Sequence, residues 1–225
     1  MPTRFCLEIS GEYACFTRPE MKVERVSYDI ITPSAVRAVF ESILWKPAIR
    51  WQPEKIEVLA PIRWTTIRRN EVGSKISVAN VKSAMQRGSG AVALYVEEER
   101  QQRASLLLRD VHYRIAASFL MTGRAGAEEN TQKFGEMFAR RAAKGQCINQ
   151  PYLGCREFAC DFRLVEPGEE AVSIPPELRG ERDLGWMLYD LDFSAASAPQ
   201  PRFFHARMTD GVVKIPLWES EEVRG

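Results

Sequence analysis

The residues best suited to chemistry in this sequence are cations gathered in its middle. Residues 46–145 hold 18 Lys or Arg and 10 Asp or Glu, whereas residues 146–225 hold 8 and 14, within a net charge of +1. A basic segment of this size is typical of a polyanion binder, because each neutralised phosphate releases condensed counterions. The alternative is a solvated basic surface without a ligand. The candidate phosphate contacts are Lys46, Arg68, Arg69, Lys75, Lys82 and Arg87.

His112 is a second residue that could act chemically. Within residues 111–115 the odd positions are apolar and the even positions polar, which places His112 and Arg114 on one face of a predicted strand. Histidine titrates near neutrality, so His112 is a candidate acid–base residue and Arg114 a candidate RNA contact. The alternative is a structural histidine.

The five cysteines predict neither a disulfide framework nor a metal site. Their number is odd and their spacing irregular, which fits a reducing compartment. Cys155 and Cys160 lack both the CxxC spacing and the nearby histidine of a zinc site. No cofactor or metal is expected. No apolar stretch approaches the roughly 20 residues of a membrane span, and no signal peptide is recognisable, so a cytoplasmic location without a membrane partner is expected.

Hydrophobic periodicity predicts the elements that must position these side chains. The first half of the chain predicts a strand over residues 5–10, a helix that begins at Thr32-Pro33 and ends near residue 44, two strands within residues 48–69, and a basic loop or thumb-like element over residues 68–90.

The second half predicts a hairpin over residues 103–121 and a helix that follows Asn130-Thr131 and stops at Gly145. The order of elements up to residue 165 favours an α+β, ferredoxin-like core with an inserted hairpin. Residues 166–225 predict a small C-terminal antiparallel β-sheet. The cations that close the second helix, whose ordinary role is to balance the helix dipole, are Arg140, Arg141 and Lys144.

Six strings follow one another along the chain. They are GEYACFTRPE at 11–20, SILWKP at 42–47, IRRNEVG at 67–73, LRDVHY at 108–113, KGQCINQPYLGCREF at 144–158 and LGWMLYD at 184–190. As an ordered set, they resemble the CRISPR-associated Cas-five family of the RAMP superfamily, in its type I-C (Dvulg) form.

The resemblance implies an RRM-like, ferredoxin-like RNA-binding domain over residues 1–165 and a C-terminal β subdomain over residues 166–225. It also implies an activity in antiviral defence. A protein of this kind cuts the repeat hairpin of precursor CRISPR RNA without a required metal, by attack of the RNA 2′-hydroxyl on the neighbouring phosphorus. It then stays bound to the guide (crRNA) among the other subunits of the type I-C interference complex. Arg140, Arg141 and Lys144 join the RNA-binding candidates.

The sequence departs from the family at two expected site positions. Family members resemble one another in a Tyr before Trp-Lys-Pro and in a Lys-His pair at the second helix, where this chain has Leu44 and Lys133-Phe134. An unperturbed lysine has a pKa of about 10.4, so Lys133 is predicted to clamp the phosphate electrostatically. His112 is the candidate substitute for the missing acid–base groups. The alternative for Lys133 is an i,i+4 pair with Glu129 on a solvated helix.

The sequence therefore leads to two main hypotheses for the function. The first is a repeat-specific endoribonuclease that holds its product. The second, motivated by Leu44 and Phe134, is a non-catalytic RNA-binding scaffold that caps the guide and docks neighbouring subunits. A third alternative is binding of duplex DNA by the basic segment.

Overall fold

One continuous β-sheet carries the fold in the computed structural model, which describes residues 4–169, 172–194 and 198–225. Its strands follow the order β5-β1-β4-β2-β8-β7-β6, with β3 paired to β4 and β9 to β7. In chain order the elements are β1 (Phe5–Ala14), α1 (Pro33–Ile43), β2 (Ile49–Val58), β3 (Arg63–Val72), α2 (Val78–Arg87), β4 (Arg100–Met121), α3 (Thr131–Ala143), β5 (Asp161–Leu164), the 3-10 turn Pro176–Leu178, β6 (Glu181–Asp192), β7 (Gln200–Thr209), β8 (Val212–Lys214) and β9 (Val223–Arg224).

The strands β5-β1-β4-β2, with α1 and α3, form a ferredoxin-like core, as the sequence predicts. Neighbouring strands in this part of the sheet are all antiparallel. Leu7 and Ile9 point from β1 into the core, where they are 0% and 1% exposed, whereas Glu8 points to the opposite face. The alternation seen in the sequence is therefore the two-sided pattern of a strand that is covered by helices on one face.

The two core helices begin and end where the sequence predicts. The Thr32 side chain accepts a hydrogen bond from the Ala35 N–H at the start of α1, and the Asn130 side chain accepts one from the Lys133 N–H at the start of α3. Helix α3 stops before Gly145, whose φ of 64° is the left-handed conformation that favours glycine.

Aromatic side chains lock these helices to the sheet. The ring of Phe138 from α3 lies 4.8 Å from Phe5 of β1 and 4.7 Å from Trp51 of β2, and Phe40 of α1 lies 4.8 Å from Trp51. Each such pair contributes about 0.5–1.5 kcal/mol beyond the area it buries. The Trp51 indole N–H donates to the Leu44 carbonyl at 2.8 Å, so the end of α1 is held by the same cluster.

The prediction of a hairpin over residues 103–121 is wrong, because this stretch belongs to the single long strand β4. The first part of β4 pairs with β3 and the second part with β1 and β2. No turn-forming pair interrupts it. Asp110 is instead an irregular position, with φ of 52°, at which the pairing with β1 passes from Val111 to Arg109.

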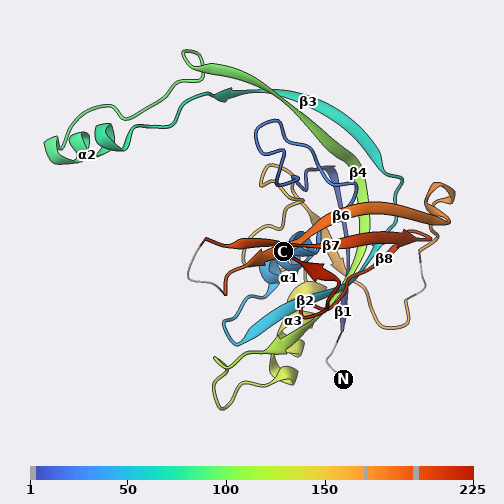
Figure 1. The fold of residues 1–225 in the computed structure, drawn as a ribbon. Coiled ribbons are helices and arrows are strands. Elements are labelled where there is room, and N and C mark those ends of the chain that lie inside the picture. The colour runs from blue at the N-terminus through green and yellow to red at the C-terminus, as the bar shows by residue number, and fades with distance from the viewer. Residues whose placement is uncertain (1–3, 170–171, 195–197) are drawn as a thin grey trace.

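Strands β3 and β4 extend beyond the core as an arm, and Figure 1 shows it curving away from the rest of the molecule with α2 at its far end. The loop predicted over residues 68–90 is wrong, because these residues belong to this arm (residues 63–109). Arg68 and Arg69 are strand residues, and Val78–Arg87 is a helix capped by Ser77 and Gly88. Helix α2 buries no residue, and its apolar side chains Val78 and Met85 are exposed.

The C-terminal strands are antiparallel, and β8 joins them to the core through β2, where Val213 faces Ile56. Hydrogen bonding therefore continues across the predicted boundary between residues 165 and 166. Among the described residues, no helix has the length and apolar character needed to cross a membrane.

Candidate functional site

The arm exposes cations on one face, and on its other face it pairs a cation with a carboxylate of the protein. Along β3, Trp64, Arg68 and Asn70 are exposed, whereas Ile67 and Arg69 are partly buried. Within the part of the chain that the structure describes, no ion pair engages the exposed cations of the arm that the sequence singled out: Arg68, Lys75, Lys82 and Arg87. These four side chains are available to phosphates, and Trp64, 37% exposed on the Arg68 face, is available to stack on a base.

Arg69 has a different environment from Arg68. Its guanidinium pairs with Glu157 and lies 5.9 Å from the Phe158 ring, and its hydrogen bond holds the pKa of Glu157 below the usual value. Arg69 therefore fastens the arm to residues 151–160. Its Nε and Nη2 atoms are buried without a partner among the described residues, so its predicted RNA contact stays a prediction.

Lys46 lies in the loop after α1, and Lys133 lies in the first turn of α3, which follows a neighbouring loop. The Thr122 hydroxyl donates to the Pro47 carbonyl at 2.6 Å, and the Thr122 N–H donates to Ala48 O at 2.8 Å. The chain that leaves Thr122 leads directly to the start of α3, where Lys133 is exposed. No ion pair between Lys133 and Glu129 is present among the described residues, and the Glu129 carboxylate instead accepts from the Gly126 N–H at 2.9 Å.

Leu44 and Phe134 stand at the positions of the family's Tyr and His, and both belong to the core. Leu44 is 0% and Phe134 1% exposed. Neither side chain can transfer a proton, and neither reaches solvent. Of the positions named from the family, the structure thus displays only Lys133, with Lys46 nearby.

His112 and Arg114 share one face of β4, as the sequence predicts, and both bind Glu8 of β1. His112 Nε2 lies 2.9 Å from Glu8 Oε1, and Arg114 Nη2 lies 3.2 Å from Glu8 Oε2. Arg114 also donates to Glu169 at 3.3 Å, and its side chain is only 7% exposed. Such an arginine holds carboxylates within the protein, and its geometry does not support the direct RNA contact predicted for it.

His112 and Lys133 lie on opposite sides of the sheet. Helix α3 packs on the face of β1 that carries Phe5, since the Phe138 and Phe5 rings are 4.8 Å apart. His112 binds Glu8, which points to the other face. The structure therefore does not bring His112 and Lys133 together, and the catalytic role of His112 stays a prediction.

The carboxylate of Glu8 should make folding stability depend on pH. Burial raises its pKa, but hydrogen bonds from His112 and Arg114 outweigh burial and hold the pKa of Glu8 below its usual value. The stability it contributes is therefore present above the unfolded pKa of about 4.3 and is lost as pH falls through the lower folded value.

We expect Glu8→Gln to lower the free energy of unfolding by about 1–3 kcal/mol at pH 6.5, because charge-assisted hydrogen bonds are lost. The difference from the parent should shrink when urea denaturation is repeated at pH 3.5. A difference that stays constant between the two pH values would contradict this assignment.

The cations at the end of α3 divide between structural and exposed positions. Arg141 Nη1 donates to the Ile43 carbonyl at 3.0 Å and so joins the ends of α1 and α3. Arg140 and Lys144 are exposed. Arg140 lies about two turns of helix from Lys133, roughly 10 Å along the axis, and Lys144 lies at the far end of the helix. Their RNA contacts remain predictions.

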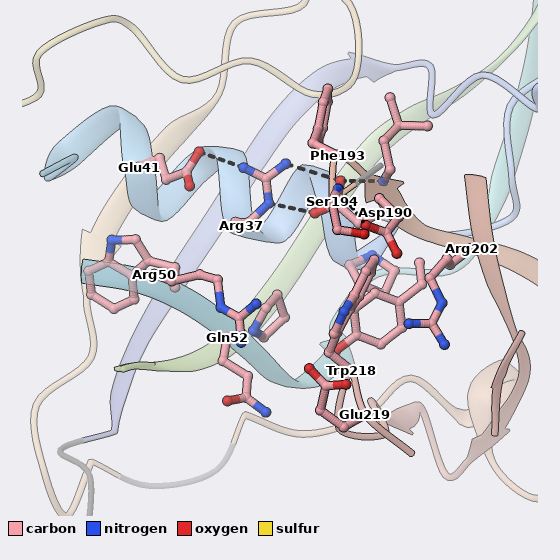
Figure 2. Close-up of a pocket in the computed structure, with 16 residues that line it drawn as sticks. Arg37, Glu41, Arg50, Gln52, Asp190, Phe193, Ser194, Arg202, Trp218 and Glu219 are labelled. Carbon is pink, nitrogen blue, oxygen red and sulfur yellow. Dashed lines mark hydrogen bonds and ion pairs between the residues drawn. The ribbon is translucent and has the colours of Figure 1, made fainter. Parts of the chain in front are cut away.

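A cavity of about 630 Å³ lies between α1, β2 and the end of β6. Figure 2 shows Arg37 at its wall between Glu41 and Asp190, with Arg37 Nε 2.6 Å from Asp190 Oδ2. None of the residues that the sequence nominated lines this cavity. Arg37 is neutralised by these two carboxylates, and Arg50 and Arg202 also line the cavity.

Sequence reasoning missed Glu8 and Glu157, which organise the cations around them. Both are ordinary charged residues in the sequence, and only strand register reveals their partners: Glu8 faces Arg114 across β1 and β4. Further arginines of the arm were also missed, namely Arg63, Arg100, Arg103 and Arg109.

Comparison with known proteins agrees with this architecture. The model of the family described as CRISPR-associated protein (Cas_Cas5), in its Cas5d form, matches residues 5–216. The chain belongs to the Cas5 family. The predicted type I-C membership is thereby confirmed. The chain is 51% identical, over the full length of both proteins, to the CRISPR pre-crRNA endoribonuclease Cas5d of Mannheimia succiniciproducens. It is 38% identical to the protein of the same name from Thermus thermophilus, over 98% of this chain and 94% of the relative.

Solved structures share the Cas5 fold. A crystal structure of a CRISPR-associated protein superimposes with a TM-score of 0.70 at 20% identity, covering 100% of this chain and 97% of the other. A functionally uncharacterized protein from Streptococcus mutans gives 0.69 at 20% identity, covering 100% and 98%. A chain of a CRISPR RNA-guided surveillance complex gives 0.53 at 12% identity, covering 96% and 90%. The α+β, ferredoxin-like fold class is confirmed.

Proposed function

We propose that this Cas5 protein cleaves the repeat hairpins of precursor crRNA and then remains bound to the guide as a subunit of a type I-C interference complex. The observation that carries the proposal is the full-length match to two relatives named CRISPR pre-crRNA endoribonuclease. Lys133 at the start of α3, Lys46 after α1 and the exposed cations of the arm supply the positive surface that such a substrate requires.

The RNA provides its own nucleophile in the proposed reaction. The 2′-hydroxyl oxygen attacks the neighbouring phosphorus, the bond to the 5′-oxygen of the next nucleotide breaks, and a cyclic phosphate forms. Lys133 acts on the charge that develops on the phosphoryl oxygens, with Lys46 nearby, and the arm holds the stem in register. With Leu44 and Phe134 buried, no side chain at those positions relays a proton, so we expect slow cleavage dominated by alignment and electrostatics.

A non-catalytic scaffold is the second candidate function, and the burial of Leu44 and Phe134 favours it. The two functions separate in one assay. The protein is incubated with its repeat RNA in excess EDTA, and the RNA is examined by denaturing and native electrophoresis. Cleaved RNA supports the endoribonuclease, and intact RNA that comigrates with the protein supports the scaffold.

The arm predicts a specific salt dependence of binding. Arg68→Ala should weaken the affinity for repeat RNA and reduce the slope of log K against log salt by about 0.7–0.9, because one phosphate contact is lost. Fluorescence anisotropy at several KCl concentrations measures this slope. Thr66→Ala, a change at an exposed position two residues earlier on the same strand, should leave the slope unchanged. Equal slopes for Arg68→Ala and the parent would show that the arm is not part of the RNA interface.

Three further proposals rest on the sequence. We place the protein in the cytoplasm, where its precursor RNA is made. We assign RNA binding to residues 1–165 and subunit docking to residues 166–225, which carry 12 acidic residues. Binding of duplex DNA by the arm is a separate outcome, and an affinity for DNA that fails to fall steeply with added salt would count against it.

A further inference from the structure

Two free cysteines from distant parts of the chain meet at the base of the arm. Cys15 follows β1, and Cys155 lies in the segment after α3. The Cys15 N–H donates to the Leu153 carbonyl at 3.0 Å, and Cys155 Sγ lies 3.8 Å from Cys15 O. The Cys155 thiol thus lies against the backbone of Cys15, and each thiol shifts the pKa of the other.

Close backbone packing holds the two cysteines together. Gly154 precedes Cys155 and has φ of 83°, and a Cβ built on it would lie 2.0 Å from Cys15 O. The adjoining Leu153 is fully buried. Residues 151–160 are therefore pressed against the end of β1, and the encounter of the two thiols is a fixed feature of the fold.

The charges around the pair favour one thiolate. The hydrogen bond from Cys155 lowers the pKa of Cys15 to about 6, and the same contact raises the pKa of Cys155. Arg25 Nη1 donates to Cys155 Sγ at 3.8 Å, and Thr17 Oγ1 lies 3.5 Å from Cys15 Sγ. The Cys155 thiol and the positive charge of Arg25 therefore favour ionisation of Cys15, and the thiolate is the reactive form of a thiol.

We propose that Cys15 and Cys155 form a site of reversible oxidation, at which a peroxide joins them in an intramolecular disulfide. Cys155 is partly exposed and Cys15 is 0% exposed, so the oxidant reaches Cys155. The Cys15 thiolate takes the proton of Cys155 as the Cys155 sulfur attacks one peroxide oxygen. The O–O bond breaks, a sulfenic acid forms, and the departing hydroxide takes the proton from Cys15 to become water.

The second step closes the disulfide. The Cys15 thiolate attacks the Cys155 sulfur, the S–O bond breaks, and hydroxide leaves. Over both steps the two sulfurs lose two electrons, and the peroxide that accepts them is reduced to water and hydroxide. The new bond would tie residues 151–160, to which Arg69 of the arm is already paired through Glu157, covalently to the end of β1.

Thiol counting on the full-length protein, without RNA, tests this proposal. The protein is treated with hydrogen peroxide, denatured, alkylated with iodoacetamide and analysed by intact mass and peptide mapping. We expect the loss of two alkylatable thiols, one cross-linked peptide joining Cys15 and Cys155, and full recovery after dithiothreitol. Five alkylatable cysteines, a bond between another pair, or Cys155 oxidised beyond the sulfenic acid without a cross-link would each overturn it.

Two variants make the result specific. Cys147→Ser removes another partly buried cysteine and should form the disulfide as the parent does. Cys155→Ser should leave the buried Cys15 alkylatable after peroxide treatment, and loss of that thiol at the parental rate would contradict the proposed order of steps. Because no RNA is present, failure here would leave the proposed cleavage activity untouched.

Discussion

Lys133→Ala is expected to slow cleavage of repeat RNA by about 10²–10³-fold, the effect of removing one preorganised group from a developing negative charge. Lys133 is exposed at the start of α3 and is the only one of the family's two helix residues that this chain retains. Single-turnover cleavage with enzyme in excess, followed by gel electrophoresis, measures the rate of the chemical step free of product release.

Two controls distinguish charge from structure at this position. Lys133→Arg keeps the positive charge and should retain most of the rate, whereas Gln132→Ala removes a neighbouring exposed side chain and should have little effect. All three variants should unfold at the parental urea concentration, because none of the side chains belongs to the core. Cleavage by Lys133→Ala at the parental rate would show that Lys133 is not the clamp.

Gly154→Ala is expected to lower the free energy of unfolding by about 2–6 kcal/mol, since it combines backbone strain with overpacking. Its φ of 83° is unfavourable for any residue with a Cβ, and the new atom would lie 2.0 Å from the Cys15 carbonyl oxygen, which cannot rotate away. Such a loss is a large part of the 5–15 kcal/mol typical of a folded domain. Urea denaturation followed by tryptophan fluorescence measures it.

Gly145→Ala provides the matched control. Gly145 also has a positive φ, 64°, but nothing lies within 4 Å of the position its Cβ would take. The cost should therefore be only the backbone term, about 1–2 kcal/mol. Equal losses for the two variants would show that the contact between residues 154 and 15 does not stabilise the fold.

Local signals in the sequence were sufficient for the core. Thr32 and Asn130 cap their helices with side-chain oxygens, and the apolar stripes that follow them are buried as expected. Phe5, Leu7 and Ile9 alternate as a half-covered strand does. In each case the residues that determine the structure are close together in the chain, so periodicity and capping alone reveal it.

The arm could not be predicted in this way. Strand β4 pairs with three different partners along its length, and α2 buries no side chain. Prediction of the candidate site from the sequence was limited for the same reason. Lys133 could be nominated only from the family resemblance, and the separation of His112 from Lys133 by the sheet depends on how α3 packs against Phe5, a contact between residues more than a hundred positions apart.

The sharing of β4 between the core and the arm restricts how this protein can change in length. Because β3 and β4 are paired residue by residue from Arg63 with Arg109 to Val72 with Arg100, an insertion of one residue in either strand would turn every side chain beyond it to the opposite face. Arg68 would then exchange places with Arg69. Related proteins with longer or shorter arms should therefore differ by matched additions to both strands, or by changes confined to the tip around α2.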